Sequence, residues 1–304
     1  MKIPPYLVPG STIGICAPAR KVSPEELAPG ISLLESWGFK VKTSTNLYAA
    51  ENQFSGSDAQ RAADMQELMD DPTVDAIISA RGGYGCMRII DQLNFNRFAQ
   101  NPKWIIGFSD LTVFHNHLHQ QFQIPSIHAT MVFSMGGDRC TPDALENLRM
   151  ILTGEEIRYS IENSSWNRKG KEEGILVGGN LSLLYALAGS ASDIDTRGKI
   201  LFIEDLDEYL YHIDRMMMQL KRSGKLDGLY GLIVGGMSDM RDNAIPFGKT
   251  AEEIIAEAVR EYTFPVCMNF PAGHIQNNQP LVMGGRVSME VGEKSVIEIK
   301  KIFK

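Results

Sequence analysis

The stretch that decides the fold is KWIIGFSDL (residues 103–111), in which an apolar run ends at a serine. The run up to Phe108 is typical of a buried strand, and the apolar residues after Ser109 recur at helical spacing as far as Phe122. We therefore expect Ser109 on a strand-to-helix turn, with its hydroxyl beside backbone N–H groups and the positive end of a helix. A second interpretation stays open, in which Ser109 or Asp110 only caps the helix.

Strand and helix patterns alternate along the first half of the chain. This alternation predicts a mostly parallel sheet with helices on both faces, and so an α/β fold. Loops that carry function should then lie at the carboxyl ends of the strands. The expected strands are 12–17, 39–43, 74–79 and 103–108, and the expected helices are 24–37, 57–69 and 111–122.

The pattern changes between about residues 141 and 173, where a short helix is followed by the polar stretch ENSSWNRKGKEEG. We interpret 141–173 as a linker region between an N-terminal α/β domain, 1–140, and a C-terminal domain, 174–304. The C-terminal domain is expected to be mixed α/β, because strand and helix patterns precede a tail that alternates like antiparallel strands from residue 285 onward.

Composition limits the classes of function. The chain has 304 residues, of which 43% are hydrophobic and 22% are charged, as in ordinary soluble globular proteins. Its net charge of -7 argues against a nucleic-acid partner, so a peptide or another small substrate is expected. No stretch has the pattern of a signal peptide or the apolar length of a membrane span. We expect a cytoplasmic protein with no membrane partner and with four reduced cysteines.

Acyl transfer by a serine needs a base of near-neutral pKa and a carboxylate that orients this base. Among the six histidines, His274 stands out because it ends the Pro/Gly-rich turn FPAGH after an apolar strand. Glu204 directly follows the apolar run ILFI, where an acid is costly unless it is paired. Ser109, Glu204 and His274 are therefore the candidate catalytic residues. The alternative is that the acids of 204–208 only cap and charge the next helix.

Two other motifs have weaker chemical interpretations. His115 and His119 share one face of a predicted helix, but no third ligand at zinc spacing accompanies them, so no metal is expected. The segment RGGYG (81–85) lacks the lysine of a phosphate-binding loop. It is either a tight turn or a loop whose amides, such as that of Gly82, face a substrate carbonyl or carboxylate. Arg81 is a candidate for binding a free carboxylate of the substrate.

Taken together, these residues resemble the LD-carboxypeptidases, serine peptidases of the muramoyl-tetrapeptide carboxypeptidase type that include the microcin C immunity proteins. The resemblance spans nearly the whole chain and keeps the family's order of motifs. Its segments are Ala17-Pro18, ARGGYG (80–85), GFSD (107–110), GGNLSLL (178–184), LFIED (201–205), DRMMMQL (214–220), PAGH (271–274) and Pro280-Leu281.

The resemblance implies that Ser109 is the nucleophile, His274 the general base and Glu204 the residue that orients it. It implies an oxyanion hole from the backbone amides of Asp110 and Gly83. The implied fold is a flavodoxin-like N-terminal domain with a β-rich C-terminal domain, commonly as a homodimer and with no cofactor. The implied reaction is release of the terminal D-Ala from a murein tetrapeptide during cytoplasmic cell-wall recycling.

The residue four positions after Glu204 helps to separate branches of this family. Microcin-immunity members resemble one another in carrying a lysine there, whereas this chain has Glu208. A carboxylate suits the free amine of a diamino acid and repels an acidic aspartyl-adenylate. Murein peptide is therefore favoured over the alternative substrates, which are peptidyl or aminoacyl nucleotides.

Asn180 and Glu208 are expected to line the substrate pocket, together with Arg81 and Gly82. Arg20 and the segment 127–130 depart from the family pattern, which leaves that wall of the pocket undefined. Whether lysine or diaminopimelate stands at the third substrate position also stays open.

Two further classes of protein remain as alternatives. An α/β-hydrolase esterase would want glycine two residues after the serine, where this chain has Leu111. A non-catalytic peptide-binding protein on the same scaffold is the other, since a fold does not fix a function.

Overall fold

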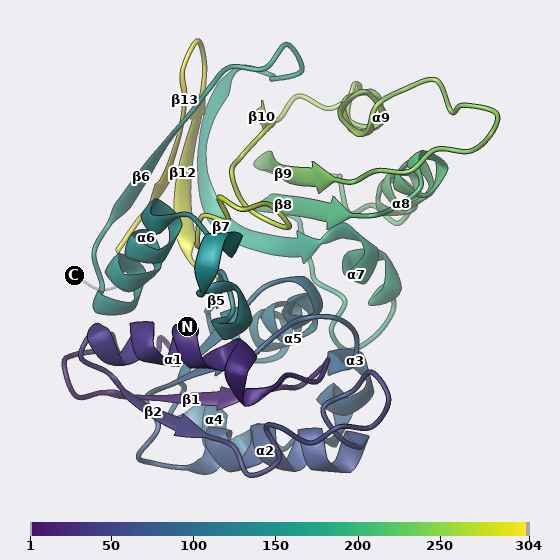
Figure 1. Cartoon of the computed structure of the whole chain (residues 1–304). Coiled ribbons are helices and arrows are strands. Elements are labelled where there is room, and N and C mark those ends of the chain that lie inside the picture. The colour runs from purple at the N-terminus through teal and green to yellow at the C-terminus, as the bar shows by residue number, and fades with distance from the viewer. Residues whose placement is uncertain (1, 302–304) are drawn as a thin grey trace.

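The computed structural model describes residues 2–301, which build two lobes, each around its own sheet (Figure 1). The first sheet has the order β11-β5-β4-β3-β1-β2, and only β11 runs antiparallel to its neighbour. The order β2-β1-β3-β4-β5 is that of a flavodoxin-like sheet, so the predicted α/β class is confirmed. Its strands are β1 (Thr12–Cys16), β2 (Lys40–Thr43), β3 (Ala76–Ser79), β4 (Trp104–Gly107), β5 (Ser126–His128) and β11 (Leu281–Met283).

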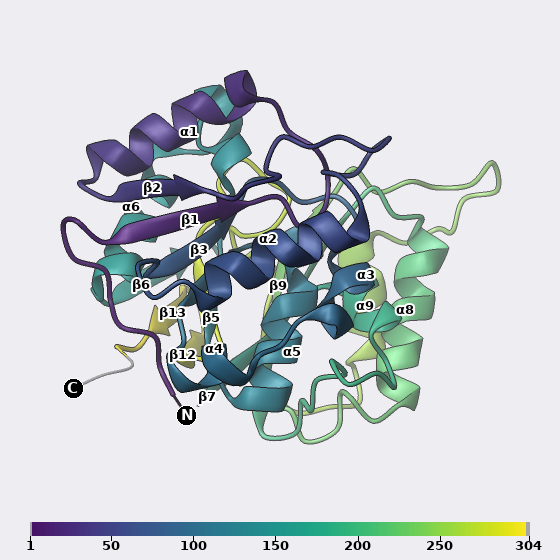
Figure 2. The same ribbon diagram turned by 90° about the horizontal axis from the view of Figure 1, so that it is seen from below.

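Helices cover both faces of this sheet, and Figure 2 shows α1 and α2 on opposite sides of β1. Alternate strand residues explain the two layers, because Ile13 and Ile78 pack in the cluster that includes α1, whereas Ile77 and Ile105 pack with α2 and α5. The helical segments are α1 (Pro24–Ser36), α2 (Asp58–Asp70), α3 (Cys86–Ile89), η1 (Ile90–Gln92), α4 (Asn96–Gln100), η2 (Ser109–Leu111), α5 (Thr112–Phe122), η3 (Val132–Ser134) and η4 (Gly137–Arg139).

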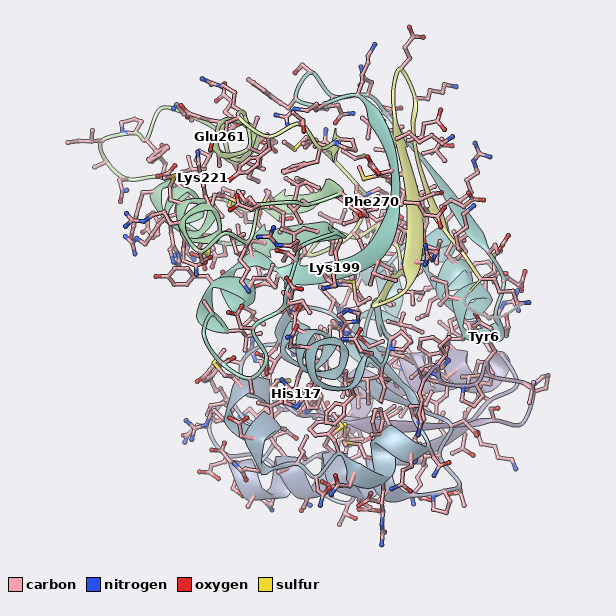
Figure 3. All side chains as sticks on the ribbon, turned by 180° about the vertical axis from the view of Figure 1, so that it is seen from behind. Tyr6, His117, Lys199, Lys221, Glu261 and Phe270 are labelled. Carbon is pink, nitrogen blue, oxygen red and sulfur yellow. The ribbon has the colours of Figure 1, made fainter. Side chains whose placement is uncertain are left out.

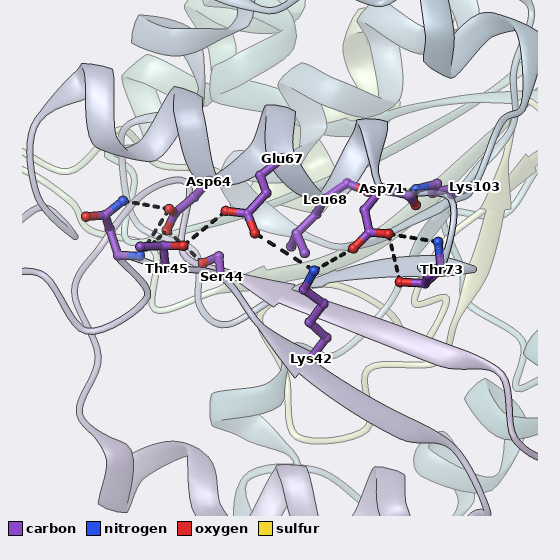
Figure 4. A network of polar contacts seen from close by, with 10 residues as sticks. Lys42, Ser44, Thr45, Asp64, Glu67, Leu68, Asp71, Thr73 and Lys103 are labelled. Carbon is purple, nitrogen blue, oxygen red and sulfur yellow. Dashed lines mark hydrogen bonds and ion pairs between the residues drawn. The ribbon is translucent and has the colours of Figure 1, made fainter.

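A polar network ties the end of α2 to the first sheet (Figure 4). Lys42 of β2 lies 2.5 Å from Asp71 and 3.9 Å from Glu67. The buried ammonium of Lys103 donates to the carbonyl oxygens of Leu68 and Asp71 at the end of the helix. A cation at the carboxyl end of a helix interacts favourably with the helix dipole and so stabilises the helix. Burial has the opposite effect on the charged form of Lys103 and lowers its pKa. The network thus fixes α2 against the strands that carry the functional loops.

The second sheet has the order β10-β9-β8-β7-β12-β13-β6. Its first four strands are parallel and its last three pair antiparallel, which matches the predicted mixed, β-rich second part. The strands are β6 (Ile157–Ile161), β7 (Gly170–Asn180), β8 (Lys199–Leu206), β9 (Gly231–Ser238), β10 (Val266–Cys267), β12 (Arg286–Val291) and β13 (Ser295–Ile299).

Both faces of the second sheet are covered by apolar side chains. Helices α8 and α9 pack in one cluster with residues such as Leu201, whereas Phe202 on the other face joins the core that reaches the first sheet. The buried ring of Phe270 lies in this lobe and contacts Phe202 and Tyr159 (Figure 3). No helix within residues 2–301 has the length and apolar character needed to cross a membrane. The remaining helices are α6 (Pro142–Thr153), α7 (Leu181–Ala186), α8 (Leu210–Arg222) and α9 (Ala251–Ala258).

The region expected to be a linker, 141–173, contains more regular structure than its composition suggested. It holds α6, β6 and the start of β7, and β6 forms the edge of the second sheet beside β13. The polar half of β7 is a strand because residues 170–174 pair with β12. In addition, β11 leaves the second half of the chain to pair with β5 in the first sheet. Strand β11 therefore connects the two lobes, because it belongs to the second half of the chain and pairs within the first sheet.

Candidate active site

Ser109 lies on the predicted turn between β4 and α5. Its backbone has the left-handed φ of 62°, which a residue other than glycine adopts only under constraint. Its side chain makes no capping hydrogen bond to α5 or to the short helix η2. The interpretation of Ser109 as a helix cap is therefore wrong, and its hydroxyl is directed to another partner.

That partner is His274, on the loop that follows β10. Nε2 of His274 lies 2.9 Å from Oγ of Ser109, and Nδ1 lies 2.7 Å from Oε2 of Glu204. Glu204, near the end of β8, has no exposed surface, whereas 14% of the His274 side chain is exposed. The structure thus brings the three candidate side chains together in one hydrogen-bonded chain that ends close to solvent.

The acids after Glu204 do not cap helix α8, although Glu208 pairs with His212 in its first turn. The alternative interpretation of 204–208 is therefore wrong for capping, and only Glu208 places its charge beside this helix. Helix α8 begins after Tyr209 without a side-chain cap. Asp205 accepts hydrogen bonds from Asn180 and Ser182, and Asp207 pairs with Arg241. These acids hold loops in place, and only Glu204 faces His274.

Two glycines of β9 make room for the histidine loop. The pairing of β8 with β9 shifts register between Ile203 and Asp205, opposite Gly235 and Gly236. The backbone N–H of Gly236 donates to the carbonyl oxygen of Ala272, and a β-carbon at Gly235 would lie 2.6 Å from that oxygen. Bulges of this kind often lie next to active sites. The sequence signal for this bulge is the Gly-Gly pair at the end of an apolar strand.

The groups around His274 shift the pKa of its imidazole. Burial opposes the charged form of His274, but the charge and hydrogen bond of Glu204, with a smaller contribution from Asp205, outweigh it. The pKa of His274 is therefore raised above its ordinary value. A base of raised pKa accepts a proton more readily from a hydroxyl at 2.9 Å.

The glycine-rich loop lies against Ser109. A β-carbon at Gly82 would come within 3.2 Å of Oγ of Ser109. Among residues 2–301, no acceptor is found for the backbone N–H of Gly82 or of Gly83, so both donors are free. The carboxylate of Asp110 accepts a hydrogen bond of 2.7 Å from the backbone N–H of Cys86, just after the loop. Asp110 therefore links the serine turn to the glycine-rich loop.

Comparison with known proteins shows the family of this chain. Residues 13–129 match the LD-carboxypeptidase N-terminal domain, and residues 173–289 match the LD-carboxypeptidase C-terminal domain. A Bacillus subtilis protein named "Probable murein peptide carboxypeptidase" is 34% identical over 97% of this chain and 93% of its own. The chain belongs to the LD-carboxypeptidase family.

Solved structures place the fold in the same family. The muramoyltetrapeptide carboxypeptidase from Oxalobacter formigenes superposes with a TM-score of 0.88 and 28% identity, over 97% of this chain and 100% of that chain. The microcin C7 self-immunity protein MccF superposes with a TM-score of 0.87 over 98% of both chains. At 23% identity, this second likeness concerns the fold alone.

Three other side chains predicted to contact substrate have partners within this LD-carboxypeptidase. The guanidinium of Arg81 lies 3.5 Å from Glu26. The side chain of Asn180 caps helix α7 and donates to Asp205, so it is engaged in holding the fold. The carboxylate of Glu208 accepts from the hydroxyl of Ser182 at 2.9 Å.

Four of the five remaining histidines of this LD-carboxypeptidase are buried, namely His115, His117, His119 and His128. Both ring nitrogens of His115 are hydrogen-bonded, to Ser126 and to the carbonyl oxygen of Gly107. Residues 2–301 contain no cluster of three or more histidine, cysteine or acidic side chains that could hold a metal ion. His212 lies 2.5 Å from Glu208, and burial holds the pKa of His128 well below its usual range.

Sequence reasoning missed the side chains that hold the histidine loop. The ring of Phe108 lies 4.9 Å from the His274 ring, measured between ring centres. The hydroxyl of Ser238 donates to the carbonyl oxygen of His274, and Asn278 accepts from the backbone N–H of Gly273. The contacts of Phe108 and Ser238 join segments far apart in sequence, so no local pattern signals them, and Asn278 lies within the histidine loop itself.

Proposed function

We propose that this protein is a serine carboxypeptidase that releases the terminal D-Ala from a murein tetrapeptide. Ser109 is the nucleophile, His274 the general base and Glu204 the carboxylate that orients it. The observation that carries the proposal is the pair of hydrogen bonds made by His274, 2.9 Å to Ser109 and 2.7 Å to Glu204. The choice of substrate is supported by the names of the Bacillus and Oxalobacter proteins described above.

In the first step, Oγ of Ser109 attacks the carbonyl carbon of the residue before the terminal D-Ala. His274 takes the hydroxyl proton at Nε2 while its Nδ1–H donates to Glu204, whose negative charge stabilises the imidazolium. The bond from carbon to nitrogen then breaks, and His274 returns the proton to the leaving amine. The products of this step are free D-Ala and an ester of the shortened peptide with Ser109.

In the second step, water hydrolyses this ester. His274 takes a proton from the attacking water, and the tetrahedral intermediate collapses to a carboxylic acid while Oγ of Ser109 regains a proton. The backbone N–H groups of Asp110 and Gly83 stabilise the oxyanion in both steps. Each such donor typically contributes about 3–4 kcal/mol to transition-state stabilisation. Within residues 2–301 the N–H of Gly83 has no acceptor, which supports its place in this hole.

The substrate contacts also belong to this proposal. Arg81 binds a free carboxylate of the peptide, the amide of Gly82 lies beside the scissile bond, and Asn180 and Glu208 border the bound peptide. The hydrogen bonds that Asn180 makes to Asp205 and to α7 mean that it shapes this border through the backbone it holds.

A second candidate function is cleavage of peptidyl or aminoacyl nucleotides, as in microcin immunity. The fold is shared with MccF, which supports this candidate. Glu208 argues against it, because its carboxylate lies where those members carry a lysine and would repel an acidic aminoacyl group. Murein peptide therefore remains the better substrate.

The proposal extends to the cellular setting and the assembly of the enzyme. We propose a cytoplasmic homodimer, and the cytoplasm is supported by four buried cysteines that are all free thiols. The division into domains 1–140 and 174–304, with 141–173 between them, also stays a proposal, since β11 crosses between the sheets.

The test is incubation of the purified protein with murein tetrapeptide, followed by mass spectrometry. We expect loss of one alanine with the wild-type protein, no turnover with Ser109→Ala, and normal turnover with the control Ser36→Ala. Thermal unfolding should show that Ser109→Ala remains folded. Full activity of Ser109→Ala would refute the nucleophile, and binding without hydrolysis by the wild-type protein would favour a peptide-binding protein.

A further inference from the structure

Three arginines from separate segments gather beside the glycine-rich loop. The guanidinium carbons of Arg81 and Arg139 lie 4.0 and 4.2 Å from the centre of the same ring, that of Phe133. Arg20 follows β1, and its side chain lies against Gly83, where an added β-carbon would come within 2.9 Å of Arg20. Arg20 is also one of the residues at which this chain departs from the family pattern.

This cluster carries more positive than negative charge. Arg81 lies 3.5 Å from Glu26, and both side chains are partly exposed, so this ion pair is weak. Burial lowers the pKa of Arg81, the charges of Arg20 and Arg139 lower it further, and Glu26 opposes them. Among residues 2–301, Glu26 is the one carboxylate within 4.0 Å of these three guanidinium groups, and it pairs with Arg81. Arg20 and Arg139 therefore have no carboxylate partner in this part of the chain.

The cluster borders the groups proposed to react. The glycine after Arg81 packs against Ser109, as a β-carbon there would lie 3.2 Å from Oγ. The carbonyl oxygen of the residue before Arg139 accepts a hydrogen bond from Gln276, two positions after His274. The arginines therefore stand on segments that contact both the nucleophile and the histidine loop.

Stacking on Phe133 suits these arginines to anion binding. A guanidinium is planar, and its N–H groups point outward in its own plane. When its face stacks on an aromatic ring, these N–H groups still point away from the ring and can bind a carboxylate in a bidentate manner. Because the stacked side chains of Arg81 and Arg139 are already ordered, less conformational entropy is lost when an anion binds.

We propose that Arg20, Arg81 and Arg139 form an anion subsite for two carboxylates at the carboxyl end of the peptide. One is the α-carboxylate of the terminal D-Ala, and the other is the side-chain carboxylate of diaminopimelate at the third position. A peptide with lysine there offers the first carboxylate only, and its side-chain ammonium gains nothing from a cationic cluster. The inference rests on the function proposed above. The subsite would make the enzyme selective for peptides with diaminopimelate at the third position.

The test compares two tetrapeptides that differ only at the third residue, diaminopimelate or lysine. The ratio of their kcat/KM values is measured for the wild-type protein, Arg20→Gln, Arg139→Gln and the control Arg286→Gln. Arg286 pairs with Glu173 on the second sheet, so this control removes one positive charge away from the cluster. Binding of both peptides to Ser109→Ala is measured by calorimetry, which needs no turnover.

We expect the wild-type protein and Arg286→Gln to prefer the diaminopimelate peptide at least about tenfold, and Arg20→Gln and Arg139→Gln to reduce this preference severalfold through a higher KM. Raising the salt concentration should also reduce the preference. Equal use of both peptides, or a ratio unchanged in both arginine variants, would overturn the subsite. Absence of hydrolysis with a retained binding preference would instead refute the proposed reaction and leave the subsite supported.

Discussion

Gly273 lies against Glu204, so closely that a β-carbon on Gly273 would come within 2.6 Å of Oε2 of Glu204. This oxygen is the atom that bonds to Nδ1 of His274. Gly273 also has a φ of 109°, which side chains other than hydrogen rarely allow. Two physical reasons therefore favour glycine at position 273, namely its positive φ and its close approach to Glu204. The second reason concerns the hydrogen bond between Glu204 and His274.

Gly273→Ala should lose activity beyond its loss of stability. The positive φ lowers the stability of a variant with any other residue here by about 1–3 kcal/mol. In addition, the new methyl group pushes against the Glu204 carboxylate and so displaces His274, which is bonded to it. A shift of about 1 Å in a catalytic group costs roughly 10²-fold in rate. Gly10→Ala is the matched control, because Gly10 has a φ of 91° and open space around it. Steady-state kinetics and chemical unfolding of both variants separate the effects, and equal kcat/KM values would contradict the prediction.

Glu204→Gln should reduce kcat by roughly 10⁴-fold while leaving the fold intact. An amide in place of the carboxylate neither stabilises the imidazolium nor fixes the tautomer with the proton on Nδ1, and the comparable loss in a serine protease triad has this size. The control is Asp207→Asn, whose carboxylate pairs with Arg241 at the surface. Single-turnover release of D-Ala measures the chemical step, and a loss below tenfold would exclude the proposed role of Glu204.

The pH dependence of kcat/KM should follow the raised pKa of His274. Because the neutral imidazole is the base, activity should fall as the pH drops through a pKa above the ordinary value for histidine, and Glu204→Gln should move this inflection to lower pH. Rates between pH 5 and 9 with both proteins measure the shift. An inflection that stays in place in Glu204→Gln would show that another group controls the profile.

The same raised pKa has a consequence for stability. A group that binds its proton more tightly when folded adds stability below its unfolded pKa, and this contribution is lost as the pH rises through the folded pKa. The wild-type protein should therefore be more stable relative to His274→Gln at pH 5.5 than at pH 9. Chemical unfolding of both proteins at the two pH values measures this difference, and a larger difference at pH 9 would reverse the sign and refute the assignment.

Ser109, Glu204 and His274 could be predicted because each follows an apolar strand, and that is a local pattern. Ser109 follows β4 of the first sheet, whereas Glu204 and His274 lie on or after strands of the second sheet. The strand pattern therefore predicted where each residue lies in its own lobe, and the expectation that they meet came from the chemistry that a serine nucleophile needs. The distance along the chain between Ser109 and His274, 165 residues, did not hide this signal. The capping alternatives failed because Ser109 and Glu204 bind His274, and Asp205 and Asp207 also bind partners outside the next helix. Of the acids in 204–208, Glu208 does pair with a residue of α8, His212.

The parts that could not be predicted depend on contacts between distant segments. The polar residues of 170–174 form a strand only because β12 pairs with them, and β11 joins the first sheet across the chain. At the bulge of Gly235 and Gly236, the carbonyl oxygen of Ala272 accepts a hydrogen bond from Gly236 and fills the space that a side chain at Gly235 would take. Apolar periodicity carries no information about such contacts.

Arg61 and Arg88 both pair with Asp58, yet their removal should have very different effects. The Arg61 side chain is 1% exposed and donates to the carbonyl oxygens of Pro18 and Gly85, next to the glycine-rich loop. Arg61→Met should therefore cost about 3–5 kcal/mol and lower activity as well, since two buried carbonyls lose their donor. Arg88→Met should cost about 0–1 kcal/mol, because the Arg88 side chain is 48% exposed. Urea unfolding of the two variants measures the contrast, and similar losses would show that Asp58, and not the loop, is what Arg61 stabilises.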